Sequence, residues 1–128
     1  NQPFFHGHSF TANALSCAAA VANIELFHSE NTLSKIKIIE NVHRSCLQHL
    51  NDKPNIKETR VCGSIGVVEL NSNHGYQSQF SDTLKNHCFK NGLYIRPLGN
   101  IIYIMPPYCS SRSTIENAWK IIEEGLDN

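Results

Sequence analysis

The sequence lacks a charge excess of either sign, because eleven Lys and Arg side chains balance eleven Asp and Glu side chains among its 128 residues. Proteins that bind nucleic acid or anionic membranes normally carry a basic stripe or patch, so both classes are disfavoured. No apolar run reaches the roughly 18 residues that a transmembrane helix needs. The longest one, residues 18–22, is short and rich in alanine, and the first residues show no pattern of a secretory signal.

Closely spaced cysteine pairs are also absent. The five cysteines are odd in number and scattered, and none forms a CxxC pair. Zinc knuckles and thioredoxin-like sites depend on such pairs, so neither is indicated. The pattern favours reduced thiols in a cytoplasmic protein. The rest of the composition is that of an ordinary globular protein, long enough for one domain with one core.

Hydrophobic periodicity predicts four helices. The first begins near Asn13, a residue type favoured at helix N-caps. The second spans about residues 33–50 and carries an apolar stripe. A short third helix contains Phe80 and Cys88. The last helix begins with a capping box at residues 113–116, and its apolar face is Ile115, Trp119, Ile122 and Leu126.

Three strands complete the expected fold. Residues 60–70 read as one long strand, bent at Gly63. Residues 93–96 and 101–105 are two short strands separated by the turn residues 97–100, so we expect them to pair as a hairpin. Because each apolar face must be buried against another layer, we predict an α+β fold, a small antiparallel sheet with helices packed on it.

The first candidate site lies directly before the first helix. Gly7, His8 and Ser9 stand there, and a hydroxyl group with exposed backbone N–H groups at a helix N-terminus suits a phosphate. A plain glycine turn with Ser9 as a local cap explains the same residues, because hydroxyl residues are common at helix starts. These residues alone leave both interpretations open.

A metal site is disfavoured. His6 and His8 alternate, so on a strand their rings would point to opposite faces and would not converge without a third ligand. His43 and His49 are not at the i,i+4 spacing of a helical ligand pair, and we expect both on the surface.

The second candidate site is Arg96, which stands between apolar strand residues and a proline. Burying a guanidinium is costly unless an acceptor meets it, and Arg binds a carboxylate through two parallel hydrogen bonds. A carboxylate-binding site is therefore one interpretation. An edge-strand Arg paired with a surface acid is equally compatible with the residues.

Three segments resemble the class III aminotransferases, in the same order along the chain. HGHSFTANALSCAAA (residues 6–20) is similar to the family segment HG-x-[ST]-F-x-x-N-P-L-x-C-A-A-A. RVCGSIGVVEL (residues 60–70) resembles the segment that opens the small C-terminal domain. IRPLGNIIYIMPPY (residues 95–108) is similar to R-P-F-G-x-L-I-Y-x-M-P-P-Y, a signature of the biotin-pathway branch. Together they favour the functional interpretation of both candidate sites.

The resemblance implies a fold-type I enzyme that uses pyridoxal 5'-phosphate and works as a cytoplasmic homodimer. Residues 1–13 would end its large cofactor-binding domain, and residues 14–128 would form its C-terminal small domain with a lead-in helix. The implied reaction moves an amino group, with S-adenosylmethionine as the usual donor, to 8-amino-7-oxononanoate, giving 7,8-diaminononanoate for biotin. The alternatives are another class III ω-aminotransferase, which the MPPY ending disfavours, and a non-catalytic, free-standing α+β binding domain.

The resemblance also implies residue roles. Ser9 takes the position of the hydroxyl residue that binds the cofactor phosphate in the partner subunit's site, and His8 stands beside it where this branch often has Pro. Gly7 and Tyr103 match positions that line the substrate pocket. Arg96 matches the residue that holds the substrate carboxylate.

The family's Schiff-base lysine lies upstream of the first motif, as does the aspartate that pairs with the pyridine nitrogen. None of the lysines in this sequence stands in such a context. We therefore expect this segment to be the C-terminal part of a longer aminotransferase. It would supply phosphate and carboxylate contacts and be inactive alone.

Overall fold

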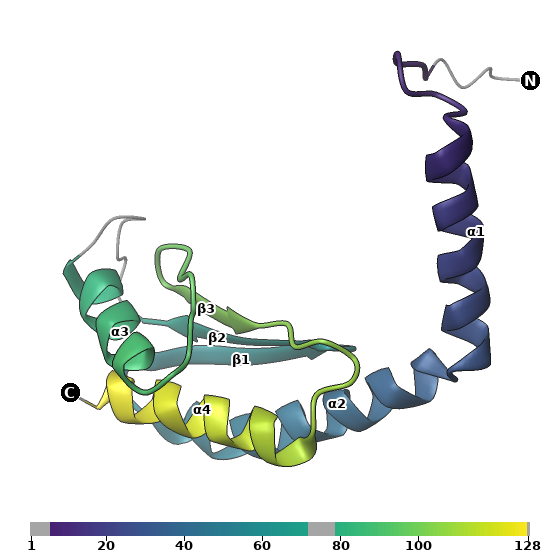
Figure 1. The fold of residues 1–128 in the computed structure, drawn as a ribbon. Coiled ribbons are helices and arrows are strands. Elements are labelled where there is room, and N and C mark those ends of the chain that lie inside the picture. The colour runs from purple at the N-terminus through teal and green to yellow at the C-terminus, as the bar shows by residue number, and fades with distance from the viewer. Residues whose placement is uncertain (1–5, 72–78, 128) are drawn as a thin grey trace, which may run out of the picture. The chain divides into compact units, whose positions relative to one another are not determined.

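The computed structural model describes residues 6–71 and 79–127, and these form helices and a three-stranded antiparallel sheet (Figure 1). The α+β class predicted from the sequence is confirmed. The chain divides into two compact units, Asn1–Leu33 and Ser34–Asn128. Over the described residues, no helix has both the length and the apolar character needed to cross a membrane.

The first unit is built around α1 (Ala14–Ser29). Its predicted start is confirmed, because the Asn13 side chain caps it by accepting a hydrogen bond from the Ser16 amide at 3.0 Å. The helix ends where Asn31 takes a left-handed backbone conformation with φ 51°, which an Asn side chain tolerates better than most. No side chain of α1 is buried within this unit.

The second unit contains the sheet, with strand order β1 (Ile56–Cys62), β2 (Ile65–Leu70) and β3 (Ile101–Ile104). The single long strand predicted over residues 60–70 is wrong. Cys62 pairs with Ile65 across a two-residue turn, and Gly63 supplies the positive φ of 55° that such a tight reversal needs. Small and apolar residues on both sides of the turn concealed it in the sequence.

The predicted hairpin between residues 93–96 and 101–105 is also wrong. β3 does form, but it pairs with β2, where Val67 lies opposite Tyr103. Residues 93–97 belong to no strand, and only Leu98 bridges back to Ile101. Pro97 has no N–H to give to a ladder, which favours β2 as the partner of β3.

Helices pack on one face of this sheet. They are α2 (Thr32–Leu47) with a following 3-10 turn (Gln48–Asp52), α3 (Gln79–Lys90) and α4 (Arg112–Leu126), and Figure 1 shows α2 and α4 running along the strands. Alternate residues of β2 point into this layer. The fully buried core side chains include Leu47, Leu50, Val68, Leu84, Ile102, Ile115 and Ile122.

The last helix begins two residues earlier than the predicted capping box. Ser111, not Ser113, is the N-cap, and its Oγ accepts a hydrogen bond from the Thr114 amide at 3.1 Å. Glu116 pairs instead with Arg112 at 2.7 Å. The predicted apolar face is confirmed, and its members Ile115, Trp119, Ile122 and Leu126 are all buried.

The surface position expected for His43 is wrong, since its side chain is 0% exposed. Its Nδ1 lies 2.8 Å from Trp119 Nε1, and its Nε2 lies 3.1 Å from the carbonyl oxygen of Ser64. An indole N–H can only donate, so Nδ1 accepts and the ring proton resides on Nε2, which donates to Ser64. His49 is exposed as expected and pairs with Glu123 at 3.1 Å.

Gly66 makes room for the buried His43–Trp119 pair. A Cβ atom at residue 66 would lie 2.7 Å from Trp119 Cζ2 and 2.8 Å from His43 Nδ1, both closer than van der Waals contact allows. The two rings therefore lie directly against the backbone of β2.

Gly66→Ala is expected to lower the free energy of unfolding by about 1–3 kcal/mol, the usual cost of overpacking a filled core. Urea denaturation measures this. Gly7→Ala is the matched control, because a Cβ at residue 7 meets nothing within 4 Å. Equal unfolding midpoints for the two variants would contradict the packing described here.

Acid should weaken the fold through His43. Burial lowers the pKa of this imidazole, and the hydrogen bond to Ser64 opposes that shift only in part. The unfolded chain then takes up the proton at a higher pH than the folded chain. Stability is therefore complete above the unfolded pKa, near 6.5, and is lost as pH falls below it.

The measurement is the urea midpoint at about pH 7.5 and about pH 5.5. The midpoint of the unchanged protein should fall at the lower pH. The midpoint of His43→Gln should fall less, because glutamine cannot take up this proton. Identical falls in both proteins would show that His43 is not responsible.

Candidate functional site

The turn before α1 leaves Ser9 available to a ligand. The Thr11 amide donates to the His8 carbonyl and the His8 amide to Thr11 Oγ1, both at 2.9 Å. The Phe10 amide donates to His8 Nδ1 at 3.1 Å. These bonds use the neighbouring groups, whereas neither the amide nor the hydroxyl of Ser9 bonds to another described residue.

This arrangement fits a phosphate. An exposed N–H and an exposed O–H on the same residue, just ahead of a helix N-terminus, are donors of the kind that anions use. The alternative in which Ser9 caps α1 does not hold, because Asn13 is the cap. His8 shapes the turn through its Nδ1, and Gly7 borders open space.

In the second unit, the structure brings Arg96 and Tyr103 together. Ile95 and Pro97 are buried on either side of Arg96, which directs the exposed Arg96 side chain outward. Tyr103 is half-buried on β3. Both line a hollow of about 250 Å³, here called the Arg96 hollow, whose walls are Leu93, Tyr94, Ile95, Arg96, Tyr103, Ile104 and Met105.

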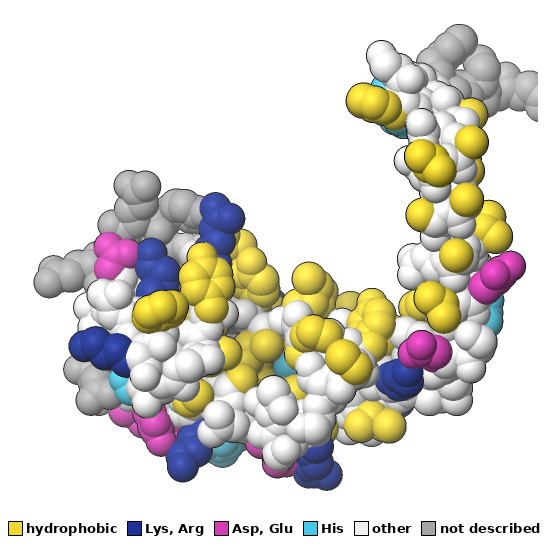
Figure 2. Space-filling model, viewed as in Figure 1, with side chains coloured by type: hydrophobic (Ala, Val, Ile, Leu, Met, Phe, Trp, Pro, Cys, Tyr) yellow, Lys and Arg dark blue, Asp and Glu magenta, His cyan; other side chains and the backbone are white. Residues whose placement is uncertain are grey.

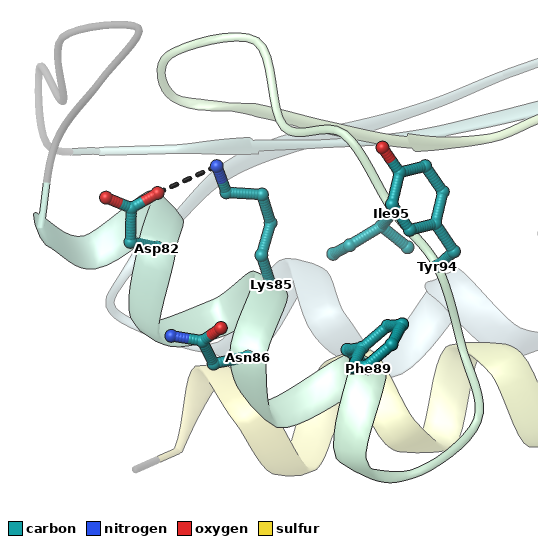
Figure 3. A pocket seen from close by; sticks show the side chains of 6 residues that line it. All are labelled: Asp82, Lys85, Asn86, Phe89, Tyr94 and Ile95. Atoms are coloured by element: carbon teal, nitrogen blue, oxygen red, sulfur yellow. Dashed lines mark ion pairs between the residues drawn. The ribbon is translucent and has the colours of Figure 1, made fainter.

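Two further hollows adjoin this region, and the sequence analysis missed both. The Lys85 hollow, of about 430 Å³, shares Tyr94 and Ile95 with the Arg96 hollow, and its other walls are Asp82, Lys85, Asn86 and Phe89 (Figure 3). The Pro107 hollow, also about 430 Å³, is lined by Ser64, Met105, Pro106, Pro107 and Tyr108. Met105 therefore belongs to two of the three hollows.

A signal for the Lys85 hollow was present in the sequence. Asp82, Lys85, Asn86 and Phe89 follow helical i, i+3, i+4, i+7 spacing, which places them on one face of α3. Figure 3 shows the Phe89 and Tyr94 rings on one side of this hollow and the Lys85–Asp82 ion pair, at 2.7 Å, on the other. What the sequence could not show is that residues 94 and 95 lie opposite that face.

The surface around the Arg96 and Pro107 hollows is largely apolar. Figure 2 shows apolar atoms gathered near β3 and the segments beside it, whereas many of the charged atoms lie along the outer sides of the helices. The large exposed apolar side chains here are Phe89, Tyr94, Leu98, Met105 and Tyr108. Such a surface suits a substrate with a long apolar chain, and the Arg96 guanidinium suits a negatively charged group at the end of that chain.

The described residues offer no group of metal ligands, and burial makes one cysteine less reactive. All five cysteines are free, and burial raises the pKa of the Cys88 thiol to about 11, which leaves it protonated at neutral pH. Within the described residues, 6–71 and 79–127, no three His, Cys, Asp or Glu side chains are grouped so that they could hold a metal ion.

Comparison with known proteins bears on the whole chain. The family model described as "Aminotransferase class-III" matches residues 1–126. The adenosylmethionine-8-amino-7-oxononanoate aminotransferase of Synechococcus elongatus is 34% identical over 125 residues, which are 97% of this chain and 29% of that protein. The enzyme of the same name from Helicobacter pylori is 32% identical over 131 residues, covering 99% of this chain and 30% of that protein.

Solved structures agree with this result. The enzyme of that name from Methanocaldococcus jannaschii superposes with a TM-score of 0.83 at 25% identity, over 97% of this chain and 30% of that one. Acetylornithine aminotransferase from Elizabethkingia anophelis superposes with a TM-score of 0.79 at 27% identity, over 100% of this chain and 32% of that one. The chain thus spans about three tenths of the length of the proteins that it matches.

Proposed function

The chain belongs to the class III aminotransferase family, and from this premise we propose that it is the C-terminal part of an enzyme that aminates 8-amino-7-oxononanoate to 7,8-diaminononanoate. The observation that carries the proposal is the Arg96 hollow, because five of its seven lining residues belong to the segment similar to the biotin-branch signature, residues 95–108. The names of the Synechococcus and Helicobacter relatives support the same substrate. S-adenosylmethionine is the proposed amino donor.

Arg96 and Tyr103 would bind different parts of the substrate. A guanidinium forms two parallel hydrogen bonds with a carboxylate, which orients the acid end of the molecule as well as binding it. The Tyr103 ring and the apolar walls of the hollow would contact the chain behind that carboxylate and exclude water from it. Gly7 is proposed to line the substrate pocket as well, since it leaves open space where a side chain would stand.

Ser9 is proposed to bind the phosphate of pyridoxal 5'-phosphate, with His8 beside it. When bound, this cofactor supplies the electron-withdrawing ring that lets an amino group pass between donor and acceptor. Ser9 would donate its hydroxyl, and its backbone N–H is free to donate as well. None of the lysines among the 128 residues stands in the context that the family uses for the covalent lysine, so we propose that another part of the enzyme supplies it.

The assembly follows the same proposal. Residues 1–13 would end the large domain, residues 14–128 would form the small domain with its lead-in helix, and two subunits would form a homodimer in which Ser9 serves the partner subunit's site. The five free thiols fit a reducing compartment, and we propose the cytoplasm.

Replacing Arg96 with lysine tests the proposed substrate site in the aminotransferase that carries this chain. Arg96→Lys keeps the charge but loses the planar fork, so the apparent KM for 8-amino-7-oxononanoate should rise roughly tenfold or more. The assay follows amino transfer from S-adenosylmethionine, with other ω-amino substrates run alongside. Arg112→Lys, an exposed Arg paired within α4, is the matched control. Unchanged kinetics in Arg96→Lys would make Arg96 structural, and preference for another substrate would favour a different ω-aminotransferase.

Ser9→Ala should weaken cofactor binding without abolishing it, because backbone N–H groups remain as donors. One lost hydrogen bond to a charged phosphate corresponds to about 1–2 kcal/mol, or roughly five- to thirtyfold in Kd. Equilibrium titration with pyridoxal 5'-phosphate measures this. Ser29→Ala, at the other end of α1 where the hydroxyl bonds only to the Leu26 carbonyl, should leave Kd unchanged.

Mixed dimers test whether Ser9 acts across the dimer. One subunit lacks the covalent lysine, so only one site can hold the cofactor covalently. If Ser9 serves the partner, Ser9→Ala on the lysine-bearing subunit leaves that site normal, and Ser9→Ala on the other subunit weakens it. The reverse pattern would show that Ser9 acts within its own chain.

A further inference from the structure

The buried His43–Trp119 pair joins three elements of the second unit. His43 comes from α2, Trp119 from α4, and the Ser64 carbonyl from the turn between β1 and β2. His43 is 0% exposed and Trp119 is 2% exposed. The neutral ring with its proton on Nε2 satisfies both bonds at once, so the imidazole holds its two neighbours in one fixed geometry.

This pair lies beneath the sheet whose strand β3 carries Tyr103 of the proposed substrate site. Gly66 lets the two rings touch the backbone of β2, and Gly66 pairs with Ile104 of β3. The next pair along the ladder is Val67 with Tyr103. Since successive residues of a strand face opposite sides, the His43–Trp119 pair supports the sheet directly behind the face that presents Tyr103.

The hydrogen bond from His43 to Ser64 provides a second connection to the proposed substrate site. Ser64 lines the Pro107 hollow with Met105, and Met105 also lines the Arg96 hollow. Met105 therefore links Ser64 to the Arg96 hollow, because it borders both hollows. A side chain that pins the Ser64 backbone from below can shape a substrate site that it does not touch.

We propose that His43 is a positioning residue for substrate binding, which acts through its hydrogen bond to the Ser64 carbonyl and its packing under Gly66 to set the geometry of the Arg96 hollow. This inference rests on the proposed function. The hydrogen bonds of His43 go to Trp119 and Ser64 and not to Arg96 or Tyr103, so its loss affects binding of the oxo acid and leaves the reacting groups in place.

Two conservative variants separate the two hydrogen bonds of the ring. In His43→Gln, the side-chain amide can take the place of Nε2 and donate to Ser64, while the acceptor for Trp119 is lost. In His43→Asn, the side-chain oxygen can take the place of Nδ1 and accept from Trp119, while the donor to Ser64 is lost. His49→Asn is the control, because His49 is an exposed histidine in the 3-10 turn that follows the same helix.

The experiment measures kcat and KM for 8-amino-7-oxononanoate in the full aminotransferase, together with the melting temperature of each variant. His43→Asn should raise KM roughly three- to tenfold, the factor that one lost hydrogen bond is worth, with kcat within about twofold. His43→Gln and His49→Asn should leave KM within about twofold of the wild type. Adding His43→Asn to Arg96→Lys should raise KM less than additively, because both changes act on one contact.

Other outcomes overturn the inference in distinguishable ways. An active wild type whose KM is unchanged in His43→Asn, with both His43 variants melting at lower temperature, would give His43 a purely structural role. If the effects of His43→Asn and Arg96→Lys on KM were fully additive, His43 would not act on the Arg96 hollow. A wild type that transfers no amino group to this oxo acid would contradict the proposed function, and the positioning role would fall with it.

Discussion

The hydrogen bond between the Trp119 indole and His43 Nδ1 joins the two long helices of the second unit beneath the central strand. It is buried, so removing either partner leaves the other without a partner away from water, at a cost of about 1–3 kcal/mol. It also requires a neutral imidazole and a glycine at residue 66. The close packing of α2 and α4 against β2 depends on these few groups.

Two of the proposed ligand contacts, Ser9 and Arg96, occupy segments without regular structure, supported by helices and strands. Ser9 lies in a turn that its neighbours stabilise with their own hydrogen bonds, and Arg96 lies in an extended segment between two buried residues. In the turn around Ser9, those hydrogen bonds are made without the Ser9 hydroxyl. The Ser9 hydroxyl is thereby available to a ligand, and Arg96 is an exposed residue, as is common for binding residues held by a rigid scaffold.

Much of the fold followed from local patterns. The N-cap at Asn13, the apolar stripe of α2 and the buried face of α4 depend on residues three or four positions apart, so periodicity was sufficient to find them. The turn at Gly63 was missed because small and apolar residues surround it and resemble a continuous strand. The hairpin expected for β3 failed because a strand pattern does not show which neighbour will supply its hydrogen bonds.

The candidate site likewise contains residues that local sequence patterns identified and residues that only the structure brought together. Sequence motifs alone picked out Ser9, Arg96 and Tyr103 and indicated the family that the matches later showed, because a phosphate donor or a carboxylate-binding Arg stands in a short, local pattern. Only the tertiary structure brought Arg96 and Tyr103 to one hollow and buried His43 against Trp119, which is 76 residues away along the chain. A histidine on a helix reads as a surface residue until its partners are known. Those partners come from α4 and the β1–β2 turn, and only the packing of the layers brings them together.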